Sequence, residues 1–184
     1  MPAPARPRFL PEVPFPPYGF VPGRFPHPVR DPAGHSYGHD PGPAAPVVPE
    51  RWGESRDYLL GLDLFNHGYY WEAHEAWERL WHAAGREGAT AELLQGLIKL
   101  AAAGVKVREG RAAGTGALAA GARELFARAA GRLPGQPSHL GLRFAELEAF
   151  SRQAEGFASD RPDEEPGARI VFPFLLLPRP EPPT

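Results

Sequence analysis

The pattern of apolar and polar positions predicts a run of helices in the middle of the chain. Over residues 54–66, Tyr58, Leu59, Leu62 and Phe65 recur at helical spacing. Glu54 and Ser55 can cap the start of this helix, and the pair His67-Gly68 supplies its stop. The same pattern predicts further helices over residues 69–84, 91–109, 112–132 and 139–157, with Thr90 and Ser138 opening the second and fourth of them.

Prolines separate this helical region from two flanks of a different kind. Fifteen of the 24 prolines lie in residues 1–50 and seven in residues 160–184, whereas none occurs between Glu50 and Leu133. Because proline breaks helix interiors, long helices can form only in the proline-free window. We therefore expect an all-α fold, a compact bundle of about five helices with proline-rich extended straps packed on it. The expected boundaries are 1–50 for an N-terminal strap, 51–158 for a helical domain and 159–184 for a C-terminal strap and tail.

The segment YYWEAHEAWERLWH, residues 69–82, concentrates aromatic and titratable side chains on one predicted helix. At about 100° per residue, one arc of about 140° holds most of the aromatic rings together with two histidines and one glutamate. The members of this arc are Tyr70, Trp71, His74, Trp77, Glu78, Trp81 and His82. Glu72, Glu75 and Arg79 fall on an adjacent arc, which we expect to face water.

His74 and Glu78 are four residues apart, so their side chains can contact each other on the tryptophan face. One interpretation is a buried hydrogen-bonded pair, since buried polar groups are usually satisfied inside the protein. A second is a divalent metal or acid–base site, because this spacing can supply two ligands to one ion. A third is a small-ligand pocket, whose walls would be Tyr70, Trp71, Trp77, Trp81, Gln95 and Lys99. The zincin motif HExxH is not met, because Glu78 stands at the position of its second histidine.

Other residues could complete such a site. A metal shell around His74 and Glu78 could gain ligands from a proline-rich flank or from the preceding turn, and the histidines available there are His27, His35, His39 and His67. The flank histidines have no fixed spacing, and His67 could instead cap a helix. Glu75 lies at the rim of the arc and is a candidate general base. The catalytic candidates are therefore His74, Glu75 and Glu78.

Composition excludes several classes of function. The net charge is −2 and the pI about 6.4, so no basic surface field favours nucleic acid. The longest apolar windows, such as LIKLAAAGV, are too short to span a membrane, and prolines break the first 20 residues too often for a signal peptide. The absence of cysteine excludes disulfides and thiolate chemistry and is consistent with a cytoplasmic protein. An aromatic-rich chain of this size could form a homodimer, although no interface is specified.

Two segments carry a resemblance to a known family. LFNHGYYWEAHEAWERLW, followed by LLQGLIKLAAAGVKVREG, resembles the domain of unknown function 309 family over about Ser55–Leu133. The resemblance implies an all-helical fold and a bacterial or archaeal source, but no established reaction. Lys99 stands where many relatives would have glutamine. The positions that match the family signature are Asn66, Gly68, Glu72, His74, Glu75, Trp77, Glu78, Trp81, Gln95 and Gly96.

These observations favour a structural or binding module with a His/Glu/Trp cluster in its core. The alternative is a metal-dependent, hydrolase-like enzyme that uses His74 and Glu78. A pair sealed by tryptophans, with every polar atom satisfied inside the protein, would count against a metal. A cavity shared with His27, His35 or His39 would favour one.

Overall fold

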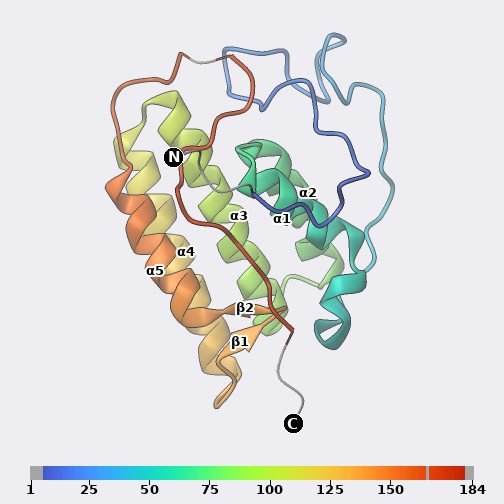
Figure 1. Cartoon of the computed structure of the whole chain (residues 1–184), viewed down its shortest axis with the longest axis vertical. Helices are drawn as coiled ribbons and strands as arrows, with labels where there is room; N and C mark the ends of the chain where they lie inside the picture. The colour runs from blue at the N-terminus through green and yellow to red at the C-terminus, as the bar shows by residue number, and fades with distance from the viewer. Residues whose placement is uncertain (1–5, 165, 181–184) are drawn as a thin grey trace.

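Helices dominate the structure, a computed structural model that describes residues 6–164 and 166–180 (Figure 1). The all-α fold expected from the sequence is confirmed, with one short hairpin added to it. The predicted tail after residue 180 lies outside the described residues. The elements are η1 (Pro49–Glu54), α1 (Arg56–Asn66), α2 (Tyr70–Ala83), α3 (Gly88–Glu109), α4 (Ala112–Arg132), β1 (Ser138–His139), β2 (Leu142–Arg143) and α5 (Phe144–Gly156).

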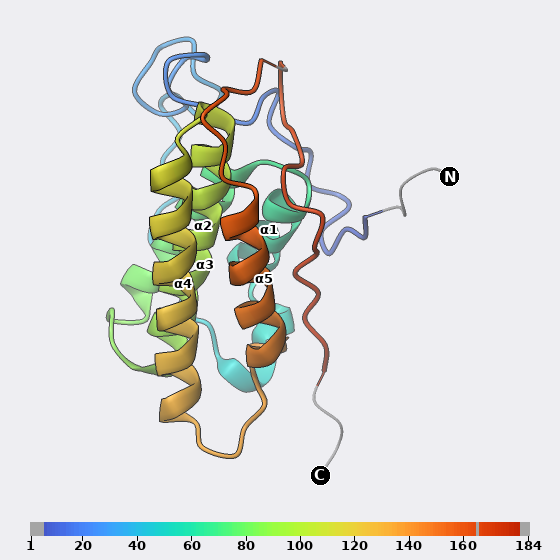
Figure 2. The same cartoon turned by 90° about the vertical axis from the view of Figure 1, so that its left-hand side faces the viewer.

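Each α-helix packs against the next one along the chain, and Figure 2 shows α4 and α5 lying side by side. The core between the helices is filled by large apolar side chains with almost no exposed surface, among them Tyr58, Leu62, Phe65, Trp77, Leu94, Leu97 and Phe126. No helix in the described part of the chain is long and apolar enough to cross a membrane.

The ends of the first helices follow local signals in the sequence. The Ser55 side chain accepts the backbone N–H of Tyr58 and so caps α1 as predicted. The predicted start of α3 is wrong, because the helix begins at Gly88 and Thr90 lies inside it. The Thr90 hydroxyl is instead 2.8 Å from Nε2 of His139. The Thr90 side chain, which the sequence suggested as a helix cap, therefore contacts a residue 49 positions away instead.

The predicted start of α5 is also wrong. Ser138 and His139 pair with Arg143 and Leu142 in an antiparallel hairpin, and the helix begins only at Phe144. The turn residues Leu140 and Gly141 have φ of 50° and 75°, the left-handed pair that a two-residue hairpin requires. The hydroxyl of Tyr58 donates to the Leu140 carbonyl oxygen at 2.8 Å, which fixes this turn to α1.

Three non-helical segments cover the bundle. We call residues 6–17 the N-terminal strap, residues 18–36 the lobe, and residues 168–180 the C-terminal strap. In Figure 1 the N-terminal strap crosses α1, and the C-terminal strap runs down the same face of the bundle towards the hairpin. The backbone N–H of Arg179 donates to the Gly141 carbonyl oxygen at 2.8 Å, so the C-terminal strap ends on the hairpin turn.

Candidate functional site

The helix α2 is turned differently from the orientation that its sequence suggested. Its core side consists of Tyr70, Ala73, Ala76, Trp77 and Leu80, all buried. Of the aromatic residues on the predicted arc, only Tyr70 and Trp77 are buried, whereas Trp71 and Trp81 are partly exposed. The small residues Ala73 and Ala76 therefore face the core, where the predicted arc placed larger side chains. The predicted arc therefore straddles the boundary between the core and the surface.

His74, Glu75 and Glu78 lie on the partly exposed face of α2 and are brought together. One ligand atom from each lies within 4.8 Å of the other two. His74 Nδ1 is 3.3 Å from a carboxylate oxygen of Glu75, and the two side chains are 27% and 42% exposed. This Nδ1 atom is itself buried and has no hydrogen-bond partner among the described residues. The pair is therefore not sealed in the core, and His74 contacts Glu75 rather than forming the expected buried pair with Glu78.

The structure does not bring the other predicted histidines to this group. His27 packs edge-on against Trp71, with ring centroids 5.4 Å apart. His35 lies beside Glu72, and His39 lines a surface groove of about 660 Å³ between the N-terminal flank and α1. His67 Nδ1 is 2.8 Å from the Asp63 carbonyl oxygen at the end of α1. This is the capping role that the sequence offered for His67 as the alternative to metal binding.

The six residues predicted to wall a ligand pocket lie in different surroundings. Tyr70 and Trp77 are part of the core, and Trp71 packs against Phe20 and His27. The Trp81 ring lies under the guanidinium of Arg86, 5.2 Å from its centroid. Gln95 lines a hollow of about 610 Å³ with Arg86, Glu92, Arg128 and Arg132. Lys99 lies across Gly121 of α4.

Glu72 is buried, and the expectation that it faces water is wrong. Its Oε1 atom accepts the backbone N–H of Phe20 at 2.8 Å and lies 3.2 Å from Nε2 of His35. The side chains of Glu72 and His35 are each 6% exposed. The lobe supplies both partners, so a segment more than 35 residues away covers this carboxylate. The buried His/Glu pair therefore exists, but it consists of His35 and Glu72.

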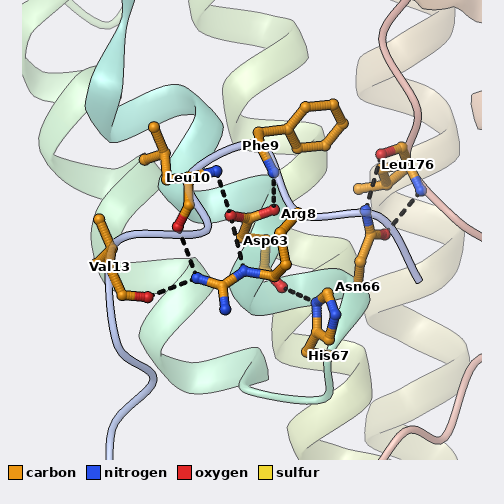
Figure 3. A network of polar contacts seen from close by, with 8 residues as sticks. All are labelled: Arg8, Phe9, Leu10, Val13, Asp63, Asn66, His67 and Leu176. Atoms are coloured by element: carbon orange, nitrogen blue, oxygen red, sulfur yellow. Dashed lines mark hydrogen bonds and ion pairs between the residues drawn. The ribbon is translucent and has the colours of Figure 1, made fainter. Parts of the chain in front are cut away.

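Sequence reasoning missed a second buried carboxylate, Asp63, at the centre of Figure 3. It has no exposed surface and accepts donors from Arg8, Phe9 and Leu10 of the N-terminal strap. One turn later, Asn66 pairs with both backbone groups of Leu176 in the C-terminal strap, each at 2.9 Å. The available signal was an acid and an amide inside the apolar run YLLGLDLFN, where an unpartnered polar group would be costly.

Tyr70 is a further anchor for the C-terminal strap. Its hydroxyl oxygen accepts the backbone N–H groups of Val171 and Phe172 at 2.9 and 3.2 Å. Burial raises the pKa of this phenol above its ordinary value, and the two N–H donors partly offset that rise. Tyr70 is therefore held neutral as an acceptor between α2 and the strap.

Comparison with known proteins finds a family model that matches part of the chain. No curated protein and no solved structure matches the chain. Residues 58–118 match a family model described as "Domain of unknown function (DUF309)". This segment includes Asp63, the metal-ligand candidates of α2 and all of α3, but neither strap. The match confirms the resemblance carried by the two helical motifs, and residues 58–118 are similar to the DUF309 family model.

Proposed function

We propose that the helical domain is a binding module whose ligand is a divalent metal ion held by His74, Glu75 and Glu78 on the partly exposed face of α2. The observation that carries the proposal is the convergence of three ligand atoms within 4.8 Å of one another. The buried Nδ1 of His74, which has no hydrogen-bond partner within the described chain, supports it. An imidazole nitrogen with two carboxylates suits zinc, manganese or iron(II) better than calcium.

The position of these residues on the surface supports an open rather than a closed metal site. Three protein ligands leave coordination positions for water or a substrate, which is the pattern of catalytic rather than structural zinc. A hydrolase-like enzyme is therefore the second candidate function, with Glu75 or Glu78 as the base that activates a bound water. The cytoplasmic location and the prokaryotic source expected from the sequence are part of the same proposal.

The competing interpretation is a structural contact without a metal. A partly exposed His–Glu contact contributes about 0–1 kcal/mol to stability. Its removal would then change the free energy of unfolding little and would affect no ligand. The structural and metal-binding interpretations therefore differ in metal binding and not in stability.

Titration calorimetry of the full chain without a histidine tag tests the proposal with Zn²⁺, Mn²⁺ and Ca²⁺. We expect one transition-metal ion per chain, with affinity reduced by about tenfold or more in His74→Ala and in Glu78→Gln, and Ca²⁺ bound more weakly. Glu124→Gln is the matched control, because Glu124 is an exposed carboxylate on α4. Equal affinity in all four proteins, or no stoichiometric binding at all, would contradict the metal site.

Glu75→Gln separates the two roles of its carboxylate. If Glu75 is a ligand, the affinity for the metal falls as it does in Glu78→Gln. If Glu75 is the base of a hydrolytic reaction, the affinity is kept, and turnover of activated ester or phosphoester substrates is lost. Retained affinity together with retained turnover would remove Glu75 from the site.

A further inference from the structure

The N-terminal strap provides the hydrogen-bond donors for the fully buried carboxylate of Asp63. The Phe9 and Leu10 N–H groups donate to it at 2.8 and 2.9 Å, and Arg8 Nε donates at 3.1 Å (Figure 3). A buried carboxylate costs several kcal/mol unless it is paired and hydrogen-bonded. These donors supply that compensation from residues more than 50 positions away. Asp63 is therefore a receptor group on α1, and the strap is its ligand.

The contacts define what this receptor recognises. It takes one guanidinium and then two consecutive main-chain N–H groups, after which Pro11 has no N–H to offer. The Arg8 guanidinium also donates to the Leu10 and Val13 carbonyl oxygens at 2.8 and 2.6 Å, so contacts within the strap help to hold its docked shape. Main-chain recognition of this kind depends on an extended, arginine-bearing segment and not on which copy of the chain supplies it.

The N-terminal strap lies on the surface of the bundle, where its release would uncover only partly buried side chains that pack against the core. None of residues 6–17 is fully buried, and Phe9, Leu10 and Phe15 are only partly covered. Pro16 and Pro17 separate the strap from the lobe, which Glu72 holds independently. Fully extended, the segment from Arg8 to the root of the strap at Pro17 spans roughly 30 Å. A second copy must therefore bring its Asp63 within that distance of the root of the strap.

Receptor and ligand also lie in different parts of the chain. Asp63 is inside the DUF309 segment of residues 58–118, whereas Arg8, Phe9 and Leu10 are far outside it. Each copy therefore carries one receptor and one ligand, and reciprocal exchange between two copies would close a symmetric pair. We propose that Asp63 marks a docking site for an arginine-bearing extended polypeptide, and that the N-terminal strap of a second copy can fill it in place of the chain's own.

The chain's own strap has the advantage of proximity. A tethered ligand competes at an effective concentration in the millimolar range, so exchange in the wild-type protein is rare at lower protein concentrations. Weakening the strap in one copy and the receptor in the other removes this advantage. The intact strap and the intact receptor can then meet only between two molecules.

Complementation between two full-length variants tests the proposal. Arg8→Ala keeps the receptor and weakens the strap, whereas Asp63→Asn keeps the strap and turns an amide N–H₂ towards its N–H donors. We expect an equimolar mixture at about 100 μM to form a 1:1 dimer in size-exclusion chromatography with light scattering, at a level about tenfold above that of either variant alone. A mixture that stays monomeric while both variants keep the wild-type far-UV circular dichroism would overturn the proposal.

The matched control replaces Arg8→Ala with Arg30→Ala. Arg30 is an exposed arginine of the lobe whose side chain has no hydrogen bond or ion pair within the described chain, so the strap stays docked in its own molecule. Mixing Arg30→Ala with Asp63→Asn should therefore give no added dimer. If Asp63→Asn does not fold, Asp63→Ser serves in its place, since it also removes the carboxylate.

A labelled synthetic peptide of residues 6–15 tests the docking site separately from the source of the strap. Fluorescence anisotropy should show tighter binding to Arg8→Ala than to the wild type, and binding weakened about tenfold or more by Asp63→Asn. No peptide binding to a folded Arg8→Ala chain would overturn the docking site. Peptide binding without complementation would overturn the second copy as its source and would indicate a different polypeptide as the partner.

Discussion

The two straps lie over the same end of α1 and are held in opposite ways. The N-terminal strap binds through Asp63 and has no fully buried residue, whereas the C-terminal strap inserts Phe172, Phe174 and Leu176, which are 1%, 7% and 0% exposed. These three side chains alternate with more exposed neighbours, as in a strand with one buried face. Two extended, proline-rich segments can therefore have different roles, and the alternation of apolar residues decides which one becomes part of the core.

The largest effect should come from emptying the core position of the C-terminal strap. Phe172→Ala removes a ring that packs on Phe65, Tyr70 and Phe174, with ring centroids 5.1–6.0 Å away. We expect a loss of about 3–5 kcal/mol in the free energy of unfolding, measured by urea denaturation. Phe157→Ala is the control, because Phe157 is 38% exposed and its truncation should cost much less. Similar costs for the two variants would mean that the C-terminal strap is not part of the core.

Gly68 tests how closely the C-terminal strap approaches the turn between α1 and α2. Its φ is +86°, and an added Cβ would lie 2.5 Å from the carbonyl carbon and oxygen of Arg169. Gly68→Ala should cost about 2–4 kcal/mol from backbone strain and overpacking together. Gly131→Ala is the matched control, since an added Cβ meets nothing within 4 Å on α4 and alanine favours the helix. A Gly68→Ala chain as stable as the wild type would show that the strap is loosely placed.

Asp63→Asn should affect the N-terminal strap and leave the C-terminal one docked. We expect a loss of about 1–2 kcal/mol, because the freed strap can hydrate its own N–H groups. Hydrogen exchange should speed up at Phe9 and Leu10, while the N–H groups of Phe172 and Leu176 keep their protection. Equally faster hydrogen exchange in both straps would show that they open together, which would contradict the proposed difference in how the two straps are held.

Alkaline pH should weaken the contact of Tyr70 with the C-terminal strap and the contact of Tyr58 with the hairpin turn. Burial raises the pKa of Tyr70 and of Tyr58 in the folded chain. In the unfolded chain both phenols ionise near pH 10, which is a lower pH than in the folded chain. Their contribution to stability is complete below that pH and is lost as pH rises towards the raised pKa of the folded state. Urea midpoints measured between pH 8 and 11 should fall, and the fall should be smaller in Tyr70→Phe. Tyr37→Phe, at a 54% exposed position, should leave the profile unchanged.

Local patterns predicted much of the fold. The proline-free window, the Ser55 cap and the glycine stops placed α1, α2 and α4 close to their observed bounds. The starts of α3 and α5 could not be predicted in this way. Thr90 and Ser138 look like caps, but a contact between Thr90 and His139 and the hairpin at Leu140 replace those roles. Contacts between residues far apart in the sequence override a cap that is worth about 1 kcal/mol.

The candidate site was harder to predict, because helical periodicity gives relative angles and not the direction of the core. His74, Glu75 and Glu78 could be grouped from their spacing alone. The predicted apolar arc includes Trp71 because a tryptophan is expected to face the helical core. The Trp71 ring packs instead against Phe20 and His27 of the lobe. Glu72 and Asp63 are buried by segments outside the helices. The apolar run around Asp63 indicates that this carboxylate needs partners, but no pattern within α1 or α2 identifies the segments that supply them.

The pairing of Asn66 with Leu176 has a consequence for the order in which the molecule is completed during translation. The ribosome makes Asn66 and its neighbour Phe65 about a hundred residues before the segment that covers them. Until Leu176 has been made, the Asn66 amide and the Phe65 ring beside it lack the C-terminal strap that covers them in the folded chain. The nascent helices therefore remain incomplete until the C-terminal strap has been made, and their last apolar surface is covered only when that strap docks.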